Sequence, residues 1–273
     1  MSHLMYNSDT DIKVTRDDMR HLRTPQPLGS RHQPYSFADF SNTVCDEIVK
    51  AGFVIDQEEF AVTKDQSKLF GLVHVKQPSK VPALSTSTAL VPGWSQLVGL
   101  RGSHDQSISR GLCIGSRVMV CSNLCFHGPL GNWYSKQTTN LVDRIPSMVA
   151  DAVTGLGNAN RTLTVDFDNF IQAKIERDTG DAVLLDIFRR GGFSPSQLGR
   201  AVTDWDRCSV EEHMANGRNL WWLFNSCTHA LKPTGRNVNH GDLQHRSTVV
   251  YSKIRGAAKD LRLEHGRRNW ALN

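Results

Sequence analysis

The spacing of apolar residues changes near residue 139, and this change constrains the fold more than any other feature of the sequence. Before it, apolar and polar residues alternate in short segments, which is typical of strands with one buried face. After it, apolar residues recur at helical spacing, as in amphipathic helices. Strands followed by helices predict an α+β fold with an antiparallel sheet.

Two hairpins make up the predicted sheet, which covers about residues 59–122. Each hairpin pairs two alternating segments across a run of turn-forming residues. The first turn contains Asp65-Gln66-Ser67, and the second contains Gly102 to Ser107. The four segments are residues 59–63, 68–76, 94–101 and 114–122.

A helix is predicted before the sheet, and several more after it. Ser36 suits the N-cap of the first helix, whose apolar residues follow at helical spacing, and Gly52 ends it. Ser194-Pro195 matches an N-cap followed by proline at the first helical position. The later helices are predicted at residues 139–154, 164–178, 181–190, 195–205, 211–231 and 244–264.

This pattern divides the chain of 273 residues into three parts. Residues 1–33 show little periodicity and are predicted to form a flexible N-terminal arm. Residues 34–235 contain the hairpins and most of the helices and are predicted to form a single α+β domain. Residues 236–273 are predicted to form a basic C-terminal helix and tail packed on that domain.

Hydropathy and cysteine content favour a protein of the cytoplasm. No apolar run approaches the ~20 residues that a membrane helix needs, so we expect no membrane partner. The first 30 residues lack a hydrophobic stretch, which argues against a secretory signal. Six cysteines are too few for a disulfide framework in a chain of this length.

One cysteine cluster has ligands suited to zinc. Cys121, Cys125 and His127 supply thiolate and imidazole groups at close spacing. Structural zinc sites usually combine two such ligand pairs, and only one dense cluster is present here. We therefore favour buried or half-buried thiols over a metal site, and we expect no cofactor.

Charge is concentrated at the C-terminus. The last 38 residues carry eight basic and three acidic side chains, an excess equal to the net charge of +5 of the whole chain. On the last helix, Val250 and Ile254 share one face and the cations lie opposite. A line of cations suits the phosphates of a nucleic acid, and a solvated face is the alternative. The predicted nucleic-acid-binding residues are Arg101, Arg117, Arg255, Lys259, Arg262, Arg267 and Arg268.

The predicted helix at residues 211–231 carries a second candidate surface. Trp221, Asn225 and Thr228 form one stripe at helical spacing. An aromatic ring beside amide and hydroxyl groups can stack on a nucleic-acid base and bond its edge. We favour the alternative, in which this stripe is buried and its polar groups bond locally.

The loop of the second hairpin contains catalytic residue types. Ser103, His104, Asp105 and Ser107 crowd together there. An oriented imidazole and a serine hydroxyl are the parts of a hydrolase. Adjacent residues on an extended chain point to opposite sides, so His104 and Asp105 do not form a relay by themselves. We favour a turn in which Asp and Ser side chains bond to backbone amides.

Three stretches together resemble a family of phage and plasmid proteins of unknown function, the domain of unknown function nine-three-two. They are Arg101 to Ser107, Gly115 to Leu124 and Asn219 to His229. The chain departs from the family pattern at Gln106, where glycine is usual, and at Ser226, where alanine is usual. The residues that match the motifs are Ser103, His104, Asp105, Ser107, Cys121, Asn123, Trp221, Asn225 and Thr228.

The resemblance implies a phage, prophage or plasmid origin and a location in the bacterial host cytoplasm, with no established activity. Together with the charge, it favours a non-enzymatic nucleic-acid-binding protein that acts on DNA, with single-strand binding or annealing in replication or recombination as its expected role. By analogy with proteins that coat single strands, we expect a homo-oligomer. One alternative is a module that binds and inhibits a host or defence protein through the arm, Trp133 and Tyr134. The other is a hydrolase centred on His104 and Asp105.

Overall fold

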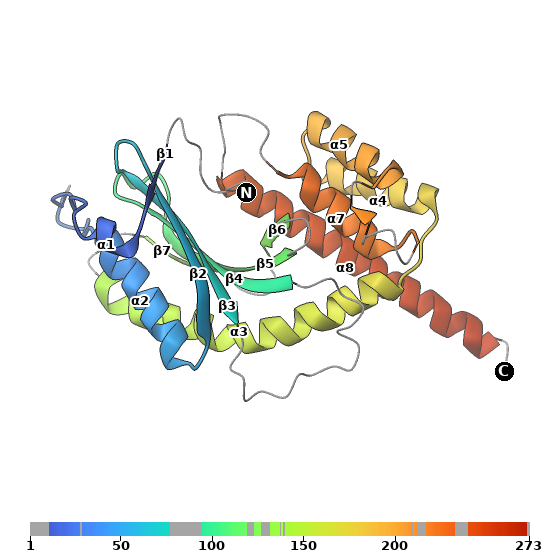
Figure 1. The fold of residues 1–273 in the computed structure, drawn as a ribbon, viewed down its shortest axis with the longest axis horizontal. Coiled ribbons are helices and arrows are strands. Elements are labelled where there is room, and N and C mark those ends of the chain that lie inside the picture. Colours follow the sequence, from blue (N-terminus) through green and yellow to red (C-terminus); the bar gives the residue numbers. More distant parts are fainter. Residues whose placement is uncertain are drawn as a thin grey trace.

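The protein is an α+β structure, with an antiparallel sheet in its N-terminal half and helices in its C-terminal half (Figure 1). This confirms the predicted fold class. The computed structural model describes residues 11–27, 29–76, 94–118, 123–126, 132–136, 138, 140–208, 210–211, 217–232 and 240–271.

The sheet contains both predicted hairpins. Its strands follow the order β1-β2-β3-β4-β5-β6, and β7 pairs with the same strand as β6. All pairs are antiparallel, and β5 starts at Arg110, earlier than predicted, because its first residues pair with β7. The strands are β1 (Asp11–Val14), β2 (Val54–Thr63), β3 (Lys68–Lys76), β4 (Trp94–Ser103), β5 (Arg110–Val118), β6 (Asn123–Phe126) and β7 (Asn132–Ser135).

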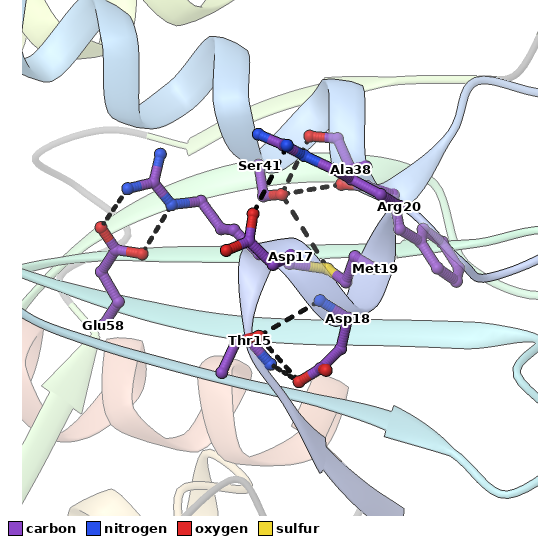
Figure 2. Close-up of polar contacts among 10 residues, drawn as sticks. Thr15, Asp17, Asp18, Met19, Arg20, Ala38, Ser41 and Glu58 are labelled. Carbon is purple, nitrogen blue, oxygen red and sulfur yellow. Dashed lines mark hydrogen bonds and ion pairs between the residues drawn. The ribbon is translucent and has the colours of Figure 1, made fainter.

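Part of the predicted flexible arm is regular structure. Strand β1 pairs along β2, and helix α1 (Arg16–Met19) follows it. The Thr15 hydroxyl accepts a hydrogen bond from Asp18 N at 3.2 Å, and Asp18 in turn accepts from Thr15 N, as Figure 2 shows. Arg16 Nε lies 2.7 Å from Glu58 Oε2 on β2. Residues 11–19 are therefore attached to the sheet by a backbone ladder and an ion pair, and the capping box holds the start of α1.

Within the described residues there are six longer helices: α2 lies beside the sheet in the N-terminal half, and the other five make up the C-terminal half (Figure 1). The predicted caps at Ser36 and Ser194-Pro195 are confirmed, since both serines accept from the backbone amide three residues on. Gly52 has a φ of 86° and ends the first long helix as predicted. The helices are α2 (Phe37–Lys50), α3 (Leu141–Gln172), α4 (Arg177–Arg189), α5 (Pro195–Asp206), α7 (Leu220–Ala230) and α8 (His240–Ala271).

Several helix predictions are wrong in their bounds. Residues 139–154 and 164–178 were predicted as separate helices, but α3 is continuous from Leu141 to Gln172 and ends there, and α4 begins at Arg177 rather than at residue 181. Helix α3 passes Gly155, where an added Cβ would lie 3.4 Å from the ring of Trp133, so the helix packs closely against that ring where its propensity is low. Helix α7 begins only at Leu220, because the side chain of Asn219 caps it by accepting from Trp222 N.

Buried residues form two apolar clusters. One lies on the face of the sheet that contains Val98 and Leu100, and α2 and the first half of α3 cover it. The other joins the second half of α3 to α4, α5, α7 and α8, with Leu97 and Cys113 reaching it from the opposite face of the sheet. The alternation predicted for β4 is thus confirmed.

Helix α8 docks on the body through the predicted face. Val250 and Ile254 are fully buried, and Tyr251 between them donates a hydrogen bond to the buried carboxylate of Asp166 on α3. The C-terminal end of α8 extends beyond the other helices (Figure 1). Among the helices within the described ranges, none has the length and apolar composition needed to cross a lipid bilayer.

Candidate functional site

Two Asp-Gln-Ser turns lie next to each other at one end of the sheet. Asp65-Gln66-Ser67 joins β2 to β3, and Asp105-Gln106-Ser107 joins β4 to β5. Since β3 and β4 are neighbours, His104 N donates to Ser67 O across the two turns at 2.7 Å. In each turn the aspartate Oδ1 accepts from the backbone N of the serine, at 3.1 and 2.9 Å.

The motif residues of the second turn are engaged in building it. Ser103 Oγ donates to Ile108 O at 3.0 Å and accepts from Ile108 N at 3.1 Å. Ser107 Oγ donates to Asp105 Oδ1 at 2.6 Å. Burial raises the pKa of Asp105, but the hydrogen bonds from Ser107 outweigh it, and the net shift is downward. These are the side-chain bonds expected of a turn, which is the interpretation favoured from the sequence.

Gln106 has a φ of 62°, in the left-handed region where glycine costs least. This is the position at which the resembled family has glycine. We expect Gln106→Gly to raise the free energy of unfolding by about 0.5–1 kcal/mol, measured by urea denaturation. Gln66→Gly should act in the same direction, because Gln66 has a φ of 57°. Gln57→Gly, within strand β2, should destabilise instead, and equal effects at all three positions would contradict the explanation.

His104 is buried beneath α2 rather than paired with Asp105. Its ring is 7% exposed and stacks on Phe37, with the centroids 3.9 Å apart. Burial lowers the pKa of His104 to about 4, and the charges of Arg110 and His32 act in the same direction, against Asp105. In the described residues Nδ1 has no hydrogen-bond partner. His104 is therefore neutral at pH 7 and is not held in a Ser-His-Asp relay.

Arg110 lies beside His104 and is completely buried. Its guanidinium carbon is 5.1 Å from the ring centroid of Phe37 and 5.4 Å from that of Phe40. One terminal nitrogen donates to Tyr35 O, whereas Nε and Nη1 have no hydrogen-bond partner in the described part of the chain. Burial lowers the pKa of Arg110 to about 9, so the side chain stays charged at neutral pH.

Arg110 is absent from the residues predicted from the sequence. A signal for it exists, because Arg110 has the same strand parity as the apolar residues Leu112 and Ile114, whose face is buried. Gly102, across the hairpin, leaves room for it: a Cβ there would lie 3.0 Å from Arg110 Cγ. A charged side chain among the residues of a buried strand face is unusual, and a buried polar residue of this kind is a candidate functional residue.

A cavity of about 370 Å³ opens at this end of the sheet. Three separate segments border it: the one before α2, the turn between β4 and β5, and the one after β7. A backbone bridge between His32 and Thr138 joins the first segment to the third. The residues that line the cavity are Arg31, His32, Gln106, Ile108, Ser109, Lys136 and Thr138.

The predicted nucleic-acid-binding residues do not form one cluster. Arg101 lies on β4, where its guanidinium carbon is 5.0 Å from the ring centroid of Tyr134. Arg255 on α8 is only 45% exposed and pairs with Asp166, whose Oδ2 lies 3.0 Å from its Nε. Lys259 is exposed. Only the backbone is described for Arg117 on β5 and for Arg262, Arg267 and Arg268 on α8.

The aromatic stripe of α7 is not a surface. Trp221, Asn225 and Thr228 are each at most 2% exposed. Asn225 Nδ2 donates to Trp221 O at 2.8 Å, and Thr228 Oγ1 donates to Phe224 O at 3.1 Å. Base stacking on Trp221 is thus incompatible with this packing, because the ring lies inside the second apolar cluster.

The cysteine cluster considered as a zinc site, for which thiols were favoured, lies largely outside the described residues. Cys121 and His127 lie outside the described residues, and Cys125 is described only as backbone in β6, as is Asn123. Within the described ranges, no group of three or more His, Cys, Asp or Glu residues is placed to hold a metal ion. Burial raises the pKa of Cys45 and of Cys113 to about 12, which keeps both as thiols.

The aromatic pair proposed for protein binding is divided by the fold. Trp133 is half-buried against Gly155 of α3, and Tyr134 is 41% exposed on the other side of β7. The sheet therefore presents one of these rings to a partner rather than two.

No protein-family model matches this chain, and no match is found among curated proteins or among solved structures.

Proposed function

We propose that this protein binds nucleic acid without catalysing a reaction, and that the C-terminal part of α8, from Lys259 onward, contacts the phosphates. The observation that carries the proposal is that the last 38 residues hold a positive charge excess equal to the net charge of the chain, and that most of these residues form α8, whose C-terminal end projects beyond the other helices (Figure 1). Cations on such an end are accessible to a long polyanion, and neutralising phosphates releases counterions.

The docked part of α8 has a different role. Lys253 Nζ lies 2.7 Å from Asp186 Oδ2 on α4, and Arg255 pairs with Asp166 on α3. These two cations are partly neutralised by the protein's own carboxylates, which makes them weaker phosphate ligands. We therefore narrow the proposed interface to Lys259, Arg262, Arg267 and Arg268.

Helix length supports this division. Helix α8 has 32 residues, and at a rise of about 1.5 Å per residue it is about 48 Å long. Its last described buried residue is Ala258, and Leu261 is half-buried against the same cluster. The remaining ~15 Å of helix contains three arginines, and it matches the length of about four base pairs of duplex or of a few single-stranded nucleotides.

The direct test is to replace Lys259, Arg262, Arg267 and Arg268 by glutamine together. We expect weaker binding of a labelled oligonucleotide in fluorescence anisotropy and a shallower dependence of log K on log salt concentration. Each lost phosphate contact should reduce the slope by about 0.7 for single strands or about 0.9 for duplex DNA. Removing residues 262–273 should act similarly, since it spares Ile254 and Ala258, which the core needs.

A matched control removes the same charge elsewhere. Lys13, Lys64, Arg161 and Arg189 are exposed on the body, and their replacement by glutamine lowers the net charge equally. If binding depends on α8, the control should keep most of the affinity and the slope. Equal losses in both variants, or no loss in the α8 variant, would contradict the proposed interface.

We also propose, on the resemblance of the three motifs alone, that the protein comes from a phage or plasmid and acts in the cytoplasm of its bacterial host. A homo-oligomer remains part of this proposal. Light scattering with and without oligonucleotide measures the oligomeric state, and a monomer under both conditions would contradict the proposed homo-oligomer.

A further inference from the structure

We propose that the cavity bordered by Arg31, His32 and Lys136 binds the phosphate group of a small ligand, of the class of inorganic phosphate or a nucleoside monophosphate. This site lies at the turn end of the second hairpin and does not depend on α8 or on the proposed function.

The lining of the cavity suits an anion. Arg31 and Lys136 bring two cations from different segments, and His32 adds a third group that can carry positive charge. Gln106, Ser109 and Thr138 add side-chain hydrogen-bond donors. None of the lining residues is an aspartate or a glutamate. A divalent cation would therefore meet repulsion, whereas a phosphate would meet charge-assisted hydrogen bonds.

A buried charge next to the cavity strengthens this inference. Arg110 directly follows the lining residue Ser109, is 0% exposed, and has no ion pair with any carboxylate in the described residues. Asp39 is the acidic residue whose charge acts on it, but the Asp39 carboxylate accepts from Ser36 Oγ at 2.7 Å. A buried cation that lacks a counter-ion is costly, and a bound anion nearby would reduce that cost.

His104 adds a second polar atom of the same kind. It lies two residues before the lining residue Gln106, and its buried Nδ1 has no hydrogen-bond partner within the described chain. The charges of Arg110 and His32 both act on it, so these three groups share one electrostatic environment beside the cavity. Buried polar atoms without protein partners are rare in native proteins, and a bound ligand or an ordered water is what satisfies them.

The size of the cavity limits the ligand. About 370 Å³ is within the roughly 300–1,000 Å³ of small-molecule sites, near the lower end. That volume accommodates a phosphate with a small organic body. Lipids and folded macromolecules are larger, so they do not fit inside it.

The test is a thermal-unfolding titration of the full chain with inorganic phosphate and with adenosine 5′-monophosphate. Potassium chloride at the same ionic strength and uncharged adenosine serve as controls. A ligand at about 100 times its Kd should raise Tm by about 5 °C. A higher Tm with inorganic phosphate but not with adenosine 5′-monophosphate would support a site for free phosphate. A higher Tm with both probes would support a site that also accepts a nucleotide. A rise with adenosine, or none with either phosphate probe at millimolar concentration, would overturn it.

Variants locate the effect. The double variant Arg31→Gln with Lys136→Gln should raise the apparent Kd for phosphate at least about tenfold, because two charge-assisted contacts are lost. Arg161→Gln with Arg189→Gln is the matched control, since both side chains are exposed and neither lines the cavity. Arg110→Met should reduce the response without abolishing it, because Arg110 does not line the cavity and its charge acts on a bound anion only from beside it. An undiminished response in the double variant of Arg31 and Lys136 would exclude this cavity.

The two proposals fail separately. The variant with four glutamines on α8 should keep the full Tm response to phosphate, because its substitutions lie outside the cavity. A loss of oligonucleotide binding with an intact phosphate response supports both proposals. A loss of the phosphate response in the α8 variant would contradict the site described here.

Discussion

Replacing Gly180 by alanine is expected to lower the free energy of unfolding by about 2 kcal/mol. Gly180 lies within α4, where a Cβ would come within 2.6 Å of Trp205 Nε1 and still closer to two carbons of the indole ring. Trp205 is 0% exposed, packs edge-on against Trp222, and donates through Nε1 to Arg177 O. The ring cannot move without disturbing these contacts, so the cost of overpacking exceeds the ~1 kcal/mol that alanine gains in a helix.

Gly199 in the neighbouring helix α5 is the matched control. A Cβ at Gly199 would have nothing within 4 Å, so Gly199→Ala should stabilise the protein by up to about 1 kcal/mol through helix propensity alone. Urea denaturation followed by circular dichroism measures both variants. Trp205→Phe should reduce the cost of Gly180→Ala, because it removes the ring atoms in the way. An unchanged cost in that background would show that the destabilisation has another origin.

Local signals were sufficient for the hairpins and for the two helix starts that have a serine cap. The Asp-Gln-Ser turns, the Ser36 cap and the Ser194-Pro195 start depend on residues within a few positions of one another, and the structure confirms them. The buried face of α8 was also predictable, because Val250 and Ile254 follow helical periodicity.

Elements that depend on distant residues were not predictable. Strand β1 has only four residues and gains its stability from pairing with β2, about fifty residues later in the chain. The continuity of α3 at Gly155 depends on packing against Trp133. Propensity alone places a helix end there, and the tertiary contact overrides it.

The candidate cavity shows the same limit most clearly. The turn residues Ser103, Asp105 and Ser107 were identified from their types, and their role in shaping the turn follows from local bonding. The aromatic partners of Arg110 lie some seventy residues before it, and the cavity is assembled from three segments. A single sequence gives no measure of such proximity, so a basic residue on a strand is assigned to the surface.

Acid is expected to destabilise the protein through His104. The ordinary histidine pKa is 6.5, and burial lowers that of His104 to about 4, with Arg110 and His32 adding to the shift. Between these two values the unfolded chain binds a proton at this position and the folded chain does not, so stability falls as pH decreases. The loss begins below pH 6.5, reaches about 2 kcal/mol at pH 5, and is complete near 3 kcal/mol once the pH is below about 4.

Carboxylates also titrate in this range, so the contribution of His104 has to be measured as a difference. His104→Phe keeps a ring that can stack on Phe37 and has no proton to bind. The wild type should therefore lose about 2 kcal/mol more than this variant between pH 7.5 and pH 5 in urea denaturation. His21→Phe removes an exposed histidine instead and should retain the wild-type loss. Parallel pH profiles for the wild type and His104→Phe would mean that the imidazole is accessible to protons in the fold, and that its stacking beneath α2 and its proximity to the charge of Arg110 do not control its protonation.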